Sequence, residues 1–125
     1  MTGDHLGEFL RSASGPWNCS TMPADWCLAL GHPDFAAPWR GITDISACAE
    51  VSAAAGGLVE LWRDGIGDGL PIVDPPYQPG DIGVVVAHGV EAGAICTGDK
   101  WAMRTARGVI FWRAPDEAIV QAWRP

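Results

Sequence analysis

The chain has 125 residues, of which 48% are hydrophobic and 18% are charged, a balance that predicts one compact domain over residues 1–125 and excludes a disordered chain. Its formal net charge of −7 argues against a nucleic-acid partner, because phosphate-binding surfaces need a basic stripe. No stretch approaches the roughly 18 apolar residues of a membrane-spanning helix, and the first ten residues lack a signal peptide's apolar run. We therefore expect synthesis and folding in the cytoplasm of a cell, with no membrane span.

Helical patterns begin the chain. Apolar spacing predicts a short helix over residues 5–12 and a second over residues 20–30. Ser20 is a good N-cap for the second helix, and Gly31 is a plausible residue for its end.

A third helix is predicted over residues 44–55, with Thr43 or Asp44 as its cap. One or two further helical turns follow over residues 58–63. Residues 64–79 are rich in glycine and proline, which predicts a long loop.

The second half of the chain changes to short runs that are typical of strands. Strands are predicted over residues 81–87, 92–97, 101–105 and 109–112, and a final helical turn over residues 115–120. Helices first and an antiparallel sheet afterwards indicate the α+β class.

Cys19 stands immediately before the helix predicted over residues 20–30. A helix N-terminus carries partial positive charge, so we expect the pKa of this thiol to fall below the roughly 8.5 of a free cysteine. That is the environment of a nucleophile. Cys27, Cys48 and Cys96 have apolar neighbours and are predicted to be small buried core residues. With no C-x-x-C pair, we expect no zinc ribbon. Because the sequence shows neither a signal peptide nor paired cysteine spacing, we also expect no disulfide. We expect no cofactor.

Several short segments occur in the order that papain-like folds of the NlpC/P60 type use: Asn18-Cys19, Ala24-Asp25-Trp26, Arg40-Gly41, Gly56-Gly57-Leu58, Gly80-Asp81, Ala92-Gly93 and Ala122-Trp123-Arg124. The chain resembles this group and, more closely, a phage-encoded, DUF6950-like family of small NlpC/P60-like proteins of unassigned function from tail gene modules. The resemblance implies a papain-like fold with N-terminal helices packed on the sheet. It also implies an ancestral activity, the cleavage of peptidoglycan stem peptides by a cysteine nucleophile.

The resemblance makes Cys19 the nucleophile, but the chain departs from the pattern at two positions. Asn18 stands where those enzymes typically have an aspartate, and Glu91 stands where they have the catalytic histidine. A carboxylate is a poor base beside a thiolate, since the two negative charges repel. His88 is the alternative base if its loop reaches back towards Cys19; otherwise it is a solvated turn histidine.

Three hypotheses for the function remain open. The first is a degenerate domain that acts as a structural or adaptor part of a phage tail tip or baseplate, carried in the virion and bound to other tail proteins. The second is a working cysteine endopeptidase that uses Cys19 and His88 on peptidoglycan during cell entry. The third is a module that binds a glycan or a protein through exposed members of the seven tryptophans, whose simpler role is core packing.

Overall fold

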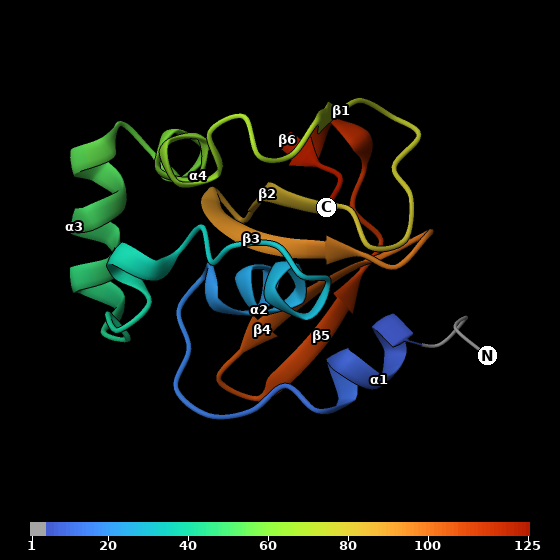
Figure 1. Ribbon diagram of the computed structural model, residues 1–125, viewed down its shortest axis with the longest axis horizontal. Coiled ribbons are helices and arrows are strands. Elements are labelled where there is room, and N and C mark those ends of the chain that lie inside the picture. Colours follow the sequence, from blue (N-terminus) through green and yellow to red (C-terminus); the bar gives the residue numbers. More distant parts are fainter. Residues whose placement is uncertain (1–4) are drawn as a thin grey trace.

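The computed structural model describes residues 5–125 as helices followed by one six-stranded antiparallel sheet (Figure 1). The helical part contains α1 (His5–Arg11), α2 (Thr21–Ala29), the 3-10 helix η1 (Ala37–Trp39), α3 (Ile45–Ala55) and α4 (Leu58–Ile66). The later part contains β1 (Ile72–Val73), β2 (Ile82–Ala87), β3 (Val90–Cys96), β4 (Trp101–Thr105), β5 (Gly108–Trp112), the 3-10 helix η2 (Asp116–Ala118) and β6 (Ile119–Trp123). The predicted α+β class and the helices-first order are confirmed.

The strands lie in the order β1-β6-β2-β3-β4-β5, so the last strand of the chain enters the sheet between β1 and β2. The helical turn predicted over residues 115–120 is therefore wrong: only Asp116–Ala118 form a 3-10 turn, and Ile119–Trp123 form a strand. Tertiary pairing with β1 and β2 decides this segment, because strand formation depends on partners more than on local preference. The predicted loop over residues 64–79 likewise contains β1 and the end of α4.

Local signals set most helix ends as predicted. The side chain of Asp44 accepts a hydrogen bond from the Ala47 amide at 2.9 Å and so caps α3. Gly56 ends that helix with a φ of 100°, a conformation that glycine adopts without strain. Gly31 follows α2 with a φ of 91°.

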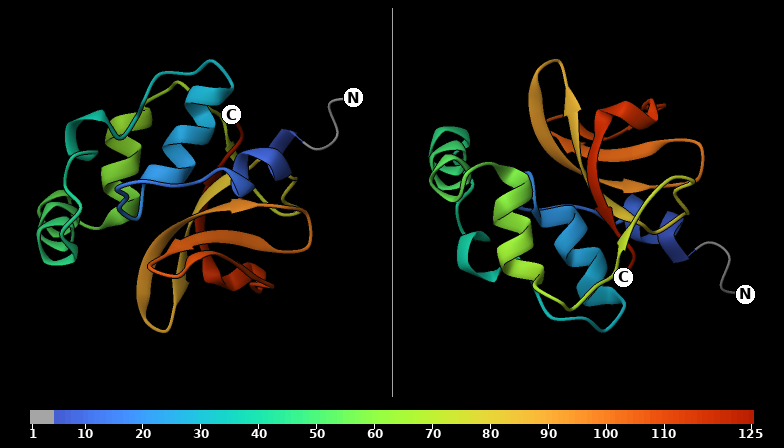
Figure 2. Two further views of the ribbon diagram at one scale, coloured as in Figure 1. Left: turned by 90° about the horizontal axis from the view of Figure 1, so that it is seen from below. Right: turned by 90° about the horizontal axis from the view of Figure 1, so that it is seen from above.

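Helices α2, α3 and α4 gather on one side of the molecule and the sheet on the other, while α1 lies nearer the sheet (Figure 2). The largest core cluster joins α2 and α4 to the sheet and centres on Trp62, which is fully buried. The ring of Trp62 lies 4.9 Å from that of Phe35 and 5.7 Å from that of Trp123. Five of the seven tryptophans are buried and the other two, Trp17 and Trp112, are half-buried, so the tryptophans mainly build the core.

A buried ion pair ties the start of β2 to the end of the chain. Asp81 is almost completely buried, and its carboxylate accepts two hydrogen bonds from the Arg124 guanidinium at 2.8 and 2.9 Å. A third bond comes from the Gln78 amide. This bidentate geometry satisfies a carboxylate that would otherwise be costly to bury.

Within residues 5–125, no single helix is long and apolar enough to cross a membrane; the bent pair α3 and α4 reaches that length and composition only together.

The closest approach between the helical layer and the sheet occurs at Gly93 of β3. A Cβ atom on this residue would overlap the carbonyl oxygen of Cys19 and would lie 2.7 Å from Cζ2 of Trp62. Both neighbours are held by the core, so neither can move aside cheaply. Glycine at this position therefore allows the chain before α2 to rest directly on β3.

We expect Gly93→Ala to destabilise the protein by about 3 kcal/mol or more, at the upper end of overpacking effects. The measurement is chemical denaturation followed by circular dichroism. Gly41→Ala is the matched control, because its Cβ would meet nothing within 4 Å, and we expect a change of less than about 1 kcal/mol. Equal stabilities for the two variants would show that Cys19 and β3 are not in contact.

Candidate functional site around Cys19

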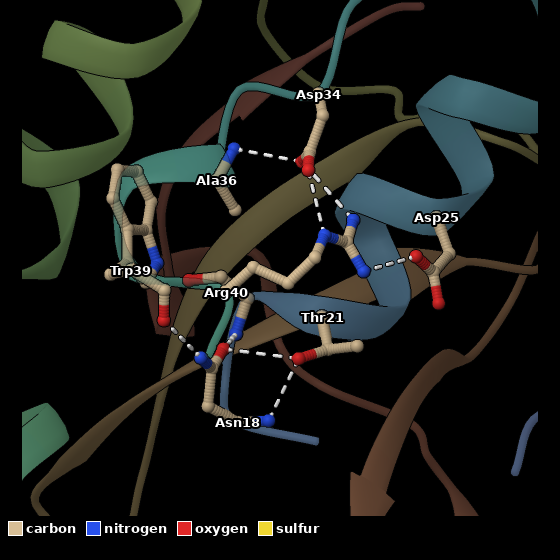
Figure 3. A network of polar contacts seen from close by, with 8 residues as sticks. Asn18, Thr21, Asp25, Asp34, Ala36, Trp39 and Arg40 are labelled. Atoms are coloured by element: carbon tan, nitrogen blue, oxygen red, sulfur yellow. Dashed lines mark hydrogen bonds and ion pairs between the residues drawn. The ribbon is translucent and has the colours of Figure 1, made fainter. Parts of the chain in front are cut away.

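Asn18 organises the entry to α2 (Figure 3). The side chain is 5% exposed, and its amide group donates to the carbonyl oxygens of Trp39 at 3.0 Å and Ile42 at 2.9 Å. Its oxygen accepts bonds from the Ser20 amide and the Thr21 hydroxyl. An aspartate could not donate to two carbonyls, so the amide is the side chain that this position requires.

Arg40 ties the loop that follows α2 to the middle of that helix (Figure 3). Its guanidinium pairs with Asp34 at 2.7 Å and with Asp25 at 2.6 Å. The hydrogen bonds from Arg40 hold the pKa of the Asp34 carboxyl below its usual value. Asp25 thus pairs with Arg40, while Arg124 pairs with Asp81.

Cys19 lies just before α2, half-buried, with its thiol directed at α3. Its sulfur is 3.8 Å from the Cys48 sulfur and 4.0 Å from the Ser20 hydroxyl. Ser20 occupies the N-cap position as predicted, but its hydroxyl accepts a bond from the Trp62 indole at 2.8 Å and caps no helix amide. The side chain of Asn18 binds the first residues of the helix in its place.

The expected activation of Cys19 is wrong in sign. Burial, with a further contribution from Cys48, raises the pKa of the Cys19 thiol from 9.0 to about 12. A helix N-terminus contributes at most about 2 kcal/mol, which corresponds to about 1.5 pKa units. Desolvation outweighs this, and the thiol is protonated at neutral pH.

Neither Glu91 nor His88 makes a hydrogen bond with the Cys19 thiol, whose partners are Ser20 and Cys48. One carboxylate oxygen of Glu91 accepts a hydrogen bond from the Leu58 amide at 3.1 Å, at the start of α4. This places a negative charge at a helix N-terminus, where it is stabilised. His88 is exposed in the turn between β2 and β3, with a φ of 53°.

The distance along β3 separates His88 from the cysteine. Gly93 marks where the Cys19 backbone meets the strand, and five residues of extended chain span roughly 17 Å. The structure thus brings Cys19 to β3, on the stretch that carries Glu91, but it does not bring His88 to Cys19.

Cys48 is the neighbour that sequence reasoning missed. It was predicted to be buried, and it is, as are Cys27 and Cys96; all four cysteines are free thiols. Its contact with Cys19 joins positions 29 residues apart, and no rule of sequence spacing predicts it. Only the tertiary placement of α3 beside the chain that enters α2 creates the pair.

Two cavities lie on the helical side of the molecule, of about 120 and 320 Å³. The larger is lined by Trp39, Ile42, Val51, Leu61 and neighbouring residues, and neither is lined by Cys19, Glu91 or His88. In the described part of the chain, no group of three or more histidine, cysteine or acidic side chains is arranged to hold a metal ion.

Comparison with known families adds one finding. Residues 9–125 match a family model that is described as a domain of unknown function, DUF6950. The protein belongs to the DUF6950 family. The match covers nearly the whole domain that the structure describes, so the Cys19 site lies inside the DUF6950 region. No curated protein and no solved structure matches the chain.

The Asn18 network predicts a marked effect of one isosteric change. In Asn18→Asp, a carboxylate would face the carbonyls of Trp39 and Ile42 with no donor to offer. We expect a loss of about 3 kcal/mol in the free energy of unfolding at neutral pH, since a buried and a part-buried carbonyl oxygen lose their donor and face a new negative charge. The loss should shrink as the pH falls, because protonation removes the charge and restores one donor.

Asp44→Asn is the matched control, a carboxylate–amide exchange at an exposed cap. We expect a change within about 0.5 kcal/mol there, because asparagine and aspartate cap equally well. Asn18→Asp stability within the same range, measured by urea denaturation at several pH values, would contradict the network.

Proposed function

We propose that this DUF6950 protein is a non-catalytic, papain-like domain of the NlpC/P60 type that serves as a structural or adaptor part of a phage tail tip or baseplate. The order of short segments along the sequence supports the papain-like relationship. So does the position of Cys19 before a helix that rests on the sheet at Gly93. Membership of DUF6950 is compatible with this role and assigns no activity.

The bonding of Glu91 is the observation that carries the proposal. The resemblance assigns this position to the catalytic histidine, and here the carboxylate accepts a hydrogen bond from the first amide of α4. The residue that replaces the imidazole is thus engaged as a helix cap. Meanwhile the Cys19 sulfur lies against the Cys48 sulfur, which is neither a base nor an orienting group.

The chemistry of amide cleavage shows what this arrangement lacks. A cysteine nucleophile must be a thiolate, and a histidine partner lowers the pKa of such a thiol to about 3–4. Burial instead raises the pKa of Cys19 to about 12. The leaving amine must also be protonated, a step that a positioned acid accelerates by about 10²–10⁴-fold. Cys19 has neither advantage.

The two alternative functions receive less support from the geometry. An endopeptidase would need His88 beside Cys19, and His88 is an exposed turn residue at the far end of the β2–β3 hairpin. A tryptophan-based binding module would need indole rings on the surface, and no tryptophan is exposed.

In the proposed role the protein is carried in the virion and its partners are other tail proteins, with peptidoglycan as a further contact during entry. A structural part of this kind needs a stable fold and a docking surface, and it needs no reactive thiol.

A muropeptide digest tests the proposal. Purified wild-type protein, Cys19→Ala and His88→Ala are each incubated with peptidoglycan, and the released peptides are measured by chromatography and mass spectrometry. We expect no release above background from any of the three. Cleavage by the wild type that both substitutions abolish would overturn the proposal and establish a Cys19–His88 endopeptidase.

A separate measurement on purified phage particles tests the proposed role in the virion. Mass spectrometry of purified particles should find the protein, and particles with Cys19→Ala should assemble and infect like the wild type. Its absence from particles would refute the tail role while leaving the non-catalytic assignment standing.

A further inference from the structure

Strand β5 forms one open edge of the sheet. It pairs only with β4 among the strands of residues 5–125 (Figure 1). Alternate residues of an edge strand direct their N–H and C=O groups outwards, ready to pair with another strand. The strand Gly108–Trp112 contains no charge and no proline, and its side chains Ile110 and Phe111 are 45% and 54% exposed.

Positive charge is concentrated around this edge. Residues 100–113 contain four basic residues and no acidic one, and the other 111 residues contain four basic and fifteen acidic residues. The β4–β5 segment therefore has a formal charge of +4 and the remainder of the chain −11. Arg107 and Arg113 lie at the two ends of β5, and the ion pair of Arg113 with Asp99 is exposed to solvent.

We propose that β5 is a docking edge for an extended segment of a partner protein in which acidic and apolar residues alternate. The partner strand would pair with the outward backbone groups of β5. Ile110 and Phe111, being adjacent, face opposite sides of the sheet, so each side of β5 carries one apolar side chain that can meet the single apolar face of the alternating strand. Arg107 and Arg113 would attract acidic side chains at the two ends.

The charge pattern selects this partner over a second copy of the chain. Antiparallel self-pairing centred on Ile110 would place Arg107 of one copy opposite Arg113 of the other, and like charges in that position are destabilising. An acidic strand meets attraction at the same places. The edge thus favours an acidic strand and disfavours a second copy of β5. Specific interfaces discriminate between partners in this way. The inference does not depend on the state of Cys19 or on the tail role.

Three fluorescein-labelled, end-capped peptides of ten residues test the proposal with the whole protein. The first alternates glutamate and valine, the second alternates lysine and valine, and the third has the glutamates of the first but proline at every valine position. Fluorescence anisotropy should show saturable binding of the first peptide. The second and third should bind at least tenfold more weakly, because one has the wrong charge and the other cannot pair as a strand.

Variants locate the site. Phe111→Asp and the double variant Arg107→Glu, Arg113→Glu should each weaken the first peptide at least tenfold. Ile45→Asp is the control, an identical kind of change at a side chain that is 84% exposed on α3, and it should leave binding unchanged. Circular dichroism checks that each variant folds, and the comparison of peptides on the wild type stands without any variant.

Several results would overturn the proposal. If the proline peptide bound as tightly as the first peptide, charge alone would explain the binding and strand pairing would be refuted. If the lysine peptide bound as tightly as the first, or if the first did not bind at all, β5 would not be a site for an acidic partner. Sedimentation velocity should find the wild type monomeric. A dimer that Phe111→Asp dissociates would assign the edge to self-association instead.

Discussion

The contact between the Cys19 carbonyl and Gly93 is the constraint on which the arrangement around Cys19 depends. Because β3 has no side chain at this point, the chain entering α2 can lie directly on the sheet. That placement brings the Ser20 hydroxyl to the Trp62 indole and turns the Cys19 thiol towards Cys48 on α3. The burial of the thiol, and with it the raised pKa, follows from the same approach.

The segments that carry the resemblance prove to be joined in pairs by structural contacts. Gly80-Asp81 meets Arg124 through the buried ion pair, and Asp25 meets Arg40 across the loop that follows α2. Leu58 meets the β3 segment through the Glu91 carboxylate. These contacts hold strand to terminus, loop to helix and helix to sheet. A chain that keeps them retains its fold whether or not an imidazole is present.

The sequence predicted what short-range chemistry decides. The Asp44 cap, the Gly31 and Gly56 helix ends and the β4 strand all follow from local signals, and the structure confirms them. The sequence could not predict β6, because this last strand forms only by pairing with β1 on one side and β2 on the other. The Cys19–Cys48 contact and the sign of the Cys19 pKa shift also required the tertiary packing of α3. Asn18 stood out as a departure from the enzyme pattern, but its role depends on two carbonyls more than twenty residues away.

The central claim is that Cys19 is a half-buried, protonated thiol with no base beside it among residues 5–125. The most direct measurement is the ultraviolet absorbance of the thiolate, titrated with pH in the wild type and in Cys19→Ser, with the difference assigned to Cys19. Because burial raises the pKa, the difference should show no ionisation step between about pH 4 and pH 9 while the protein stays folded. A step in that range, below the roughly 8.5 of a free thiol, would contradict the account and identify an activated nucleophile.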